Sequence, residues 1–313
     1  MPTYDNIHAH LSMLADRRRT EAYREAIARV VRPGDTVLDF GTGTGVLAIF
    51  AERAGAAKIY ALDKSRMIEA ARQLIELNGC KRIQLLRGDA STLELPEPVD
   101  VIVSEWMGHF LFDDEMLEPL IRLRDNYLRP GGRMLPERCS LHAGLMLAPH
   151  EYERLGTLRG RPYDIDFGPI AEWPFAQSGP IELQAQHVLP HSTQIGELEM
   201  ATIARTPERL SGIIVSAIDC VSYGLCGWFE AQLTASLRIG NSPFQPSTSW
   251  KWFYFPFDQP LPVRAGEPVA IELAVLTHPR RTSYTWSARS GNQRRQGDDV
   301  LVDAWLAERK TRG

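Results

Sequence analysis

The chain has 313 residues, of which 44% are hydrophobic and 24% are charged, an ordinary composition for a globular protein with a sizeable core. Its formal net charge of −4 excludes a general basic field that would attract nucleic acid, so we expect no direct nucleic-acid partner. No apolar run reaches the roughly 18 residues of a membrane-spanning helix, and the first residues lack a signal-peptide pattern. We therefore expect no membrane span and no export.

Cysteine usage fits this expectation. The four cysteines are widely spaced and form no C-x-x-C pair, so the spacing of zinc ligands is absent: Cys80, Cys139, Cys220 and Cys226. We interpret them as reduced thiols of a cytoplasmic protein and expect no metal site.

The first part of the chain alternates between helical and strand patterns. Residues 1–30 form an N-terminal segment with helix over 7–30 in two pieces, and a domain over 31–137 follows. We expect strands at 36–40, 58–63, 82–87, 99–104 and 133–136, and helices at 45–54, 65–78 and 114–127. Such alternation predicts an α/β fold with a doubly wound parallel sheet of the Rossmann type.

The character of the sequence changes after Pro136, where Pro and Gly turns separate short strand patterns. We expect strands at 138–147, 181–189, 195–204, 211–221, 228–239, 250–257 and 267–276. This pattern predicts an all-β domain over 138–313, a barrel or a sandwich, with a short helix or strand at 298–309. Residues 148–180 interrupt it and form either a surface loop or an oligomerisation arm. Its aromatic residues have no obvious place in a barrel core: Tyr152, Tyr163, Phe167, Trp173 and Phe175.

A glycine-rich loop joins the strand at 36–40 to the helix that follows. Gly41, Gly43 and Gly45 give the spacing G-x-G-x-G, which differs from the dinucleotide fingerprint and lacks the lysine of a phosphate-binding loop. A plain strand–turn–helix corner is the alternative. However, Asp39 precedes the loop, and Asp63 ends the next strand, where a carboxylate accepts the hydroxyls of a ribose. A nucleoside ligand without phosphates fits best, and S-adenosylmethionine is the common cofactor of that kind.

Four acids lie at or just after the carboxyl ends of the predicted strands of this sheet: Asp39, Asp63, Asp89 and Glu105. The carboxyl ends of parallel strands lie at one edge of a sheet, where ligands bind. We therefore expect these carboxylates at one site.

The segment after the strand at 99–104 is the most specific. It reads Ser104-Glu105-Trp106-Met107-Gly108, and Asp114 lies nine positions after the glutamate. This pattern resembles the double-glutamate hairpin of the protein arginine methyltransferases. Other segments resemble motifs of that family in order and spacing: Met13-Leu14-x-Asp16-x-x-Arg19-Thr20-x-x-Tyr23, Val37-Leu38-Asp39-x-Gly41-x-Gly43-Thr44-Gly45, Leu128-x-Pro130-Gly131-Gly132, Ser242-Pro243, Thr248-Ser249-Trp250-Lys251 and Gly266-Glu267.

The resemblance covers nearly the whole chain and implies a fold, an activity and an assembly. The fold is a Rossmann-type domain followed by a β-barrel, with an inserted dimerisation arm at about 148–180. The activity is transfer of methyl groups from S-adenosylmethionine to arginine guanidino nitrogens of a protein or peptide, with asymmetric dimethylation favoured. The assembly is a homodimer.

The resemblance also implies site residues. Glu105 and Asp114 would hold the guanidinium, with Glu115 as a substitute. The cofactor contacts would be His10, Arg19 (on the methionine carboxylate), Asp39, Gly41, Gly43, Asp63, Glu105 and, around the adenine, Asp89, Ala90 and Ser91. The acceptor pocket would include Tyr4, Met13, Met116, Ser249 and Trp250.

Two departures from the family pattern keep alternatives open. Asp114 is one methylene shorter than the second glutamate of the family, and Asp113-Asp114-Glu115 also suits the acid-rich start of a helix. Ser249 stands where the family has a histidine, and a serine carries no proton near neutral pH. The alternatives are a methyltransferase for a small guanidino compound or another metabolite, and an inactive scaffolding homologue.

Overall fold

The computed structural model describes residues 5–278 and 281–299, which fall into two compact units. One unit comprises Met1–Cys139, Leu198–Arg205 and Glu230–Gly240, and the other comprises Ser140–Glu197, Thr206–Phe229 and Asn241–Gly313. Most of the segment 298–309, for which a short helix or strand is expected, lies outside the described residues, as does Tyr4.

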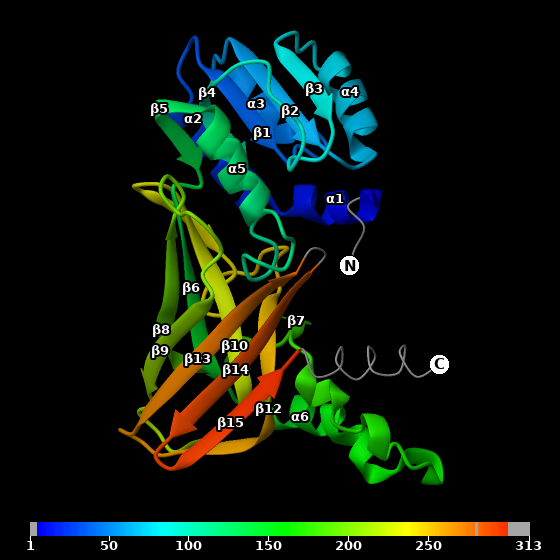
Figure 1. Cartoon of the computed structure of the whole chain (residues 1–313), viewed down its shortest axis with the longest axis vertical. Coiled ribbons are helices and arrows are strands. Elements are labelled where there is room, and N and C mark those ends of the chain that lie inside the picture. Colours follow the sequence, from blue (N-terminus) through cyan, green and yellow to red (C-terminus); the bar gives the residue numbers. More distant parts are fainter. Residues whose placement is uncertain (1–4, 279–280, 300–313) are drawn as a thin grey trace. The chain divides into compact units, whose positions relative to one another are not determined.

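The first unit contains a five-stranded parallel sheet with the order β3-β2-β1-β4-β5 (Figure 1). Its strands are β1 (Thr36–Phe40), β2 (Lys58–Asp63), β3 (Ile83–Arg87), β4 (Val99–Ser104) and β5 (Leu128–Leu135). All five residues of β1 are buried, as in a parallel strand that is covered on both faces. The doubly wound sheet that the alternating pattern predicts is confirmed, and the strand order reverses between β1 and β4.

The helices of this unit are α1 (Ile7–Ala15), α2 (Arg17–Val30), α3 (Val46–Arg53), α4 (Met67–Leu77) and α5 (Leu117–Tyr127). The break between α1 and α2 has a local cause, because the Asp16 carboxylate accepts the Arg19 backbone N–H at 3.0 Å and caps α2. The expected start of a helix at 114 is wrong. Glu115 has a φ of 57°, which a right-handed helix does not allow, and α5 begins only at Leu117.

The second unit is built from two antiparallel sheets (Figure 1). One has the order β7-β12-β10-β6-β8, with β11 paired to β10, and the other has the order β15-β14-β13-β9. Their strands are β6 (Arg138–Met146), β7 (Gly179–Ile181), β8 (Val188–Glu199), β9 (Arg209–Val215), β10 (Cys220–Thr234), β11 (Leu237–Gly240), β12 (Trp252–Val263), β13 (Pro268–His278), β14 (Arg281–Ser290) and β15 (Gln293–Asp298). Part of β10 and all of β11 are assigned to the first unit.

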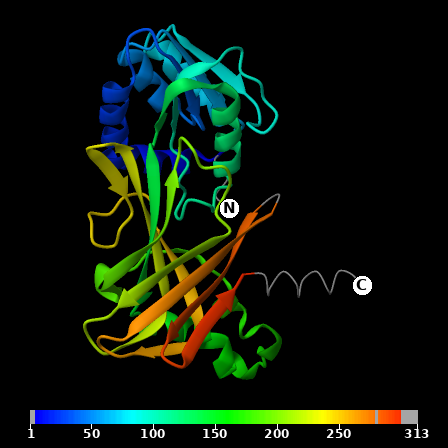
Figure 2. The ribbon, with the colours of Figure 1, turned by 60° about the vertical axis from the view of Figure 1, so that its left-hand side comes forward.

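Side chains connect the two sheets into the expected barrel. The Gln296 backbone N–H donates to the Asp258 carboxylate at 3.1 Å, and Arg295 Nε donates to the Pro260 carbonyl at 2.9 Å, so β15 is tied to β12. Inside, aromatic rings of β12 and β14 meet at centroid distances of 5.5 Å, as between Phe255 and Trp286. Figure 2 shows these strands from a second side.

Several expected strand bounds in this half are wrong. β8 joins the end of the range 181–189 to the first half of the range 195–204, and the rest of the range 181–189 lies mostly outside any strand. The expected strand at 211–221 is split between β9 and β10. β14 and β15 lie in a stretch for which the sequence predicts no strand. β15 reads Gln293-Arg-Arg-Gln-Gly-Asp298 and carries no apolar side chain, so it has none of the alternation that marks a half-buried strand.

The insertion between β6 and β7 is a compact arm and not an open loop. It consists of α6 (Pro149–Leu155) and four 3₁₀ turns, η1 (Gly156–Gly160), η2 (Pro162–Asp164), η3 (Gly168–Ile170) and η4 (Trp173–Ala176). Phe175 is buried, and the Tyr152 ring lies between Phe175 at 4.9 Å and Tyr223 at 5.3 Å. The expectation that these aromatics lack a place is therefore wrong for Tyr152 and Phe175. In contrast, Tyr163 is 91% exposed.

Candidate active site

The glycine loop lies between β1 and α3 and is tied to the neighbouring strand. The backbone N–H groups of Gly41 and Thr42 donate to the Leu62 carbonyl at 2.9 and 3.0 Å. Gly41 and Gly43 have φ values of 75° and 54°, which other residues rarely adopt. A Cβ atom on Gly41 would lie 2.8 Å from Met116 Cε, and one on Gly43 would lie 2.8 Å from His10 Cε1. His10, a predicted cofactor contact, and Met116, a predicted residue of the acceptor pocket, therefore lie against the loop.

Asp63 is fixed beside this loop at the end of β2. Its Oδ2 accepts the Gly43 backbone N–H at 2.8 Å, and its Oδ1 accepts the Ser65 backbone N–H at 2.7 Å. A carboxylate oxygen has a second acceptor position, so a hydroxyl ligand can still be bound. The acid predicted to hold a ribose thus lies on the glycine loop.

Asp39 is completely buried at the end of β1. Its Oδ2 accepts the Thr42 hydroxyl at 2.5 Å and the Ala48 backbone N–H at 3.0 Å, which fixes the loop to the start of α3. Its Oδ1 is buried and has no hydrogen-bond partner among the described residues. Burial, reinforced by the nearby charge of Asp63, raises the pKa of Asp39 to about 7, although the bonds from Thr42 and Ala48 act in the opposite direction.

Glu105 follows β4 and forms an ion pair with Arg19 of α2. The exposed fractions of the two side chains are only 13% and 10%, so the pair lies away from bulk water. The adjacent Tyr23 hydroxyl donates to the Ser104 carbonyl at 3.1 Å and holds α2 against the end of β4. Burial raises the Tyr23 pKa well above its ordinary value, and the Glu105 charge adds to this effect. Glu105, the first acid of the hairpin, is therefore mostly buried and pairs with the guanidinium of Arg19.

The three consecutive acids of the hairpin lie in different surroundings. Asp113 accepts the backbone N–H groups of His109 and Phe110 at 2.9 to 3.0 Å and thereby closes the turn. Asp114 lies against Gly108, where an added Cβ would be 2.8 Å from its Oδ2. Glu115 has a left-handed backbone, and its buried Oε1 finds no hydrogen-bond partner within the described ranges. Burial raises the Glu115 pKa, and the Lys64 charge opposes the shift.

The segment after β3 holds the three residues predicted to surround an adenine. Asp89 Oδ1 accepts both the backbone N–H and the hydroxyl of Ser91, at 2.8 and 2.6 Å, and these bonds lower the Asp89 pKa. Ala90 is buried, and its carbonyl accepts a guanidinium N–H of Arg122 at 2.7 Å.

Lys64, which lies near these acids, is not among the residues that the sequence predicts for the site. The charge of Lys64 adds to the lowering of the Asp89 pKa by Ser91 and opposes the rise of the Glu115 pKa caused by burial, so its ammonium lies within electrostatic reach of two predicted site segments. Its position directly after Asp63 is the signal that could have identified it.

Ser249 and Trp250 belong to the second unit, whereas the loop and the hairpin belong to the first. Asn241 holds their segment, because its side chain accepts the Phe229 N–H at 2.9 Å and donates to the Lys251 carbonyl at 2.6 Å. Trp250 is buried with its ring edge-on to Phe229 at 5.1 Å. In the first unit, Met13 is half-buried on α1, and its carbonyl accepts the Thr20 hydroxyl at 3.4 Å.

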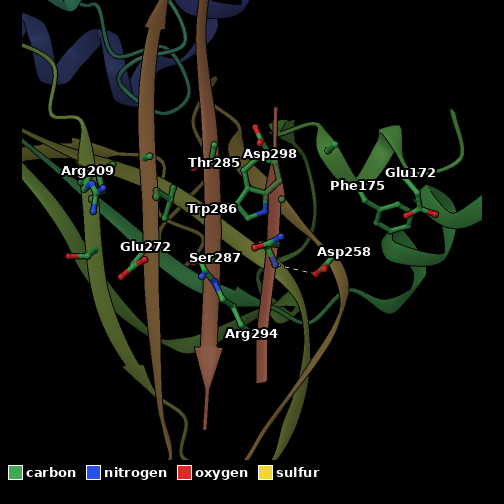
Figure 3. Close-up of a pocket in the computed structure, with 17 residues that line it drawn as sticks. Glu172, Phe175, Arg209, Asp258, Glu272, Thr285, Trp286, Ser287, Arg294 and Asp298 are labelled. Atoms are coloured by element: carbon green, nitrogen blue, oxygen red, sulfur yellow. Dashed lines mark hydrogen bonds between the residues drawn. The ribbon is translucent and has the colours of Figure 1, made fainter. Parts of the chain in front are cut away.

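The barrel unit has a cavity of about 610 Å³ over β9, β13, β14 and β15 (Figure 3). No residue that the sequence predicts for the site lines it. Its charged lining carries both signs, since Arg209 and Arg294 lie there with Glu272 and Asp298, and it indicates no single class of ligand.

Two negative findings apply to residues 5–278 and 281–299. No three His, Cys, Asp or Glu side chains there are arranged to bind a metal ion. No helix in those ranges has both the length and the apolar character needed to cross a bilayer.

Comparisons with known proteins agree with this arrangement. The profile of a family described as a methyltransferase domain matches residues 37–132. The chain is 32% identical over 297 residues to protein arginine N-methyltransferase 6 of Danio rerio, covering 87% of this chain and 83% of that protein. It is 34% identical over 288 residues to protein arginine N-methyltransferase 1 of Saccharomyces cerevisiae, covering 87% and 81%.

Solved structures are similar in fold. The Trypanosoma brucei PRMT1 enzyme–prozyme heterotetrameric complex with AdoHcy aligns with a TM-score of 0.84 at 23% identity, over 95% of this chain and 99% of that chain. Arabidopsis thaliana protein arginine methyltransferase 10 aligns with a TM-score of 0.81 at 24% identity, over 95% and 99%. From the sequence relatives, with the fold in agreement, this chain belongs to the protein arginine N-methyltransferase family.

Proposed function

We propose that this chain transfers methyl groups from S-adenosylmethionine to the guanidino nitrogens of arginine residues in proteins or peptides. One observation carries the proposal: Glu105, at the start of the acidic hairpin, already pairs with a guanidinium in a nearly water-free position. The relatives at 32% and 34% identity carry the same activity in their names, which favours a protein acceptor over a small guanidino compound.

The residues of the first unit fit S-adenosylmethionine. At Gly41 and Gly43 an added Cβ would come within 2.8 Å of Met116 or His10 and would have an unfavourable positive φ, so glycine suits a loop that approaches a ligand closely. Asp63 beside it offers oxygens for ribose hydroxyls, and no lysine of a phosphate-binding loop is present at this turn. Bound there, the cofactor supplies an electrophilic methyl group on a positively charged sulfonium.

We assign the remaining cofactor contacts by the same reasoning. His10 covers the loop at Gly43, and Asp89, Ala90 and Ser91 form the turn for the adenine. A guanidinium carries five donors in a planar fork, so Arg19 can serve both Glu105 and the carboxylate of the methionine moiety. Asp39 acts on the cofactor through the loop that it fixes.

The acids of the hairpin are suited to a cationic acceptor. Two unit charges of like sign cost about 4 kcal/mol at 4 Å and an effective dielectric near 20, and a guanidinium next to a sulfonium would meet that cost. Carboxylates on the guanidinium offset it and grip the planar fork with directional hydrogen bonds. They also draw positive charge onto the bound nitrogens and leave the third more nucleophilic.

We assign this grip to Glu105 together with Asp114 or Glu115. Asp114 stands at the family position, whereas Glu115 has the longer side chain and a buried oxygen without a partner among the described residues. Met13 and Met116 are the proposed apolar walls of the acceptor site on the first unit, and asymmetric dimethylation is the favoured product.

The test is mass spectrometry after incubation with S-adenosylmethionine and arginine-rich peptides, with free arginine in a parallel reaction. We expect methylated arginine in the peptides, at least a hundredfold less product from Glu105→Gln, and a cofactor affinity within a few fold of the wild type. Glu97→Gln is the matched control, because Glu97 forms a solvent-exposed pair with Lys58. Methylation of free arginine alone would favour the small-molecule alternative, and comparable turnover by Glu105→Gln would contradict the carboxylate grip.

For the organisation of the chain we propose a cofactor domain at 31–137 after the helical segment 1–30, and a substrate barrel at 138–313. We further propose a homodimer that uses the arm at 148–180. The exposed Tyr163 and Ile165 support it, since isolated large apolar side chains on a projecting segment suit an interface. The four cysteines all lie in the described ranges and form no disulfide, which supports a cytoplasmic location.

A further inference from the structure

The proposed function uses the Asp39 carboxyl only to fix the glycine loop and leaves its burial unexplained. It has no exposed surface, and only one of its two oxygens is hydrogen-bonded among the described residues. That oxygen holds both the glycine loop, through Thr42, and the start of α3, through Ala48. An ionised carboxylate is poorly stabilised when it is buried and one of its oxygens has no hydrogen-bond partner. A cation bound nearby would therefore shift the equilibrium from the protonated to the ionised carboxyl.

The charged groups that act on Asp39 and on Tyr23 are mostly acidic. Asp63 at the end of β2 lies within electrostatic reach, and Tyr23 of α2 senses Asp39, Glu105 and Arg19 together. These described groups comprise three carboxyls and one guanidinium. A ligand that brings an additional positive charge would favour the ionised form of Asp39, whereas a neutral ligand of the same shape would not.

We propose that Asp39 discriminates the charged methyl donor from its neutral product, by losing a proton to solvent when the sulfonium form binds and keeping it when the sulfide form binds. The inference rests on the cofactor of the proposed function. S-adenosylmethionine and S-adenosylhomocysteine share the adenosine and the amino-acid group, and they differ in the methyl group and in one positive charge on sulfur. The proton passes from the Asp39 carboxyl to the buffer, and no bond of the ligand is made or broken.

The direction of the pH effect follows from the burial of Asp39. Because its pKa is raised to about 7, the free protein is largely protonated at this position below neutral pH. A lower pKa in the donor complex makes donor affinity rise with pH and level off above about 7. For a decrease of one pKa unit, the preference for the donor over the product increases about fivefold between pH 6 and pH 8.

Calorimetric titration at pH 6.5 tests the proposal. Each ligand is titrated in two buffers of different ionisation enthalpy, and the difference in heat gives the number of protons released. We expect release on binding the donor, much less on binding the product, and no difference between the two in Asp39→Asn. His10 also lies on the loop, so His10→Asn is measured as well and should retain the difference.

A second measurement uses the unmodified chain, so its result does not depend on whether a variant folds. The infrared C=O band of a protonated carboxylic acid should decrease when the donor is added and persist when the product is added. Equal proton release for both ligands, or a difference that survives in Asp39→Asn, would overturn the inference. Failure of both ligands to bind would contradict the proposed cofactor as well.

Discussion

The His10 ring lies so close to Gly43 that a Cβ atom on the glycine would come within 2.8 Å of His10 Cε1. α1 and the β1–α3 loop, which lie far apart in the sequence, therefore share one cradle within the first unit. The Gly43 backbone N–H in turn donates a hydrogen bond to the Asp63 carboxylate. A side chain at position 43 would therefore have to displace the His10 ring.

This closeness predicts a specific effect of Gly43→Ala. The methyl group must displace His10, and it adds the strain of a residue with a φ of 54°, which costs roughly 1 kcal/mol. We expect cofactor affinity, measured by calorimetry, to fall at least tenfold. Gly131→Ala is the matched control, because Gly131 has a φ of 74° but no described atom within 4 Å of its Cβ position. It should lose similar stability and keep its affinity, and a Gly43→Ala protein that binds normally would contradict the cradle.

How far the sequence could predict this site depends on the range of the interactions. The bounds of β1, β2 and β4 match their predicted ranges, because each is a short, mostly apolar segment that ends at an acid or is followed by a glycine or an acid. The pairing of Arg19 with Glu105, which are 86 positions apart, has no local signal. The left-handed backbone at Glu115 has none either, which is why the helix was expected three residues too early.

Asp113 provides a second prediction, since its carboxylate accepts two backbone N–H groups and closes the hairpin. Asp113→Ala leaves these donors without that acceptor, at a cost of about 1–3 kcal/mol of folding free energy. We expect kcat/KM for a peptide to fall at least tenfold, because Asp114 and Glu115 lose their positions. Cofactor affinity should stay within a few fold. Unchanged peptide kinetics would show that the turn does not position these acids.

Asp39 also predicts a pH dependence of stability. Its pKa is raised to about 7 in the folded chain and is about 3.8 when unfolded, so between these values the unfolded state releases the proton first. This group's contribution to the free energy of unfolding therefore falls as pH rises from about 4 to 7, by roughly 1.4 kcal/mol per pH unit, and is constant above. Urea titrations at pH 5, 6 and 7 should show this slope as a difference between the wild type and Asp39→Asn. If the free energies of unfolding of the two proteins changed with pH in the same way, the predicted contribution of Asp39 would be excluded.

The arm offers a pair of aromatic residues that separate folding from association. Phe175 is buried, with the Arg159 guanidinium 3.9 Å above its ring, whereas Tyr163 is 91% exposed. Phe175→Ala should lower the free energy of unfolding by about 3–5 kcal/mol, because it removes a buried ring. Tyr163→Ala should leave that energy within about 0.5 kcal/mol after extrapolation to the monomer, but should weaken the proposed homodimer in light scattering at micromolar concentration. A wild-type chain that is monomeric at that concentration would rule out the arm as a stable interface, because no association would then remain for Tyr163 to support.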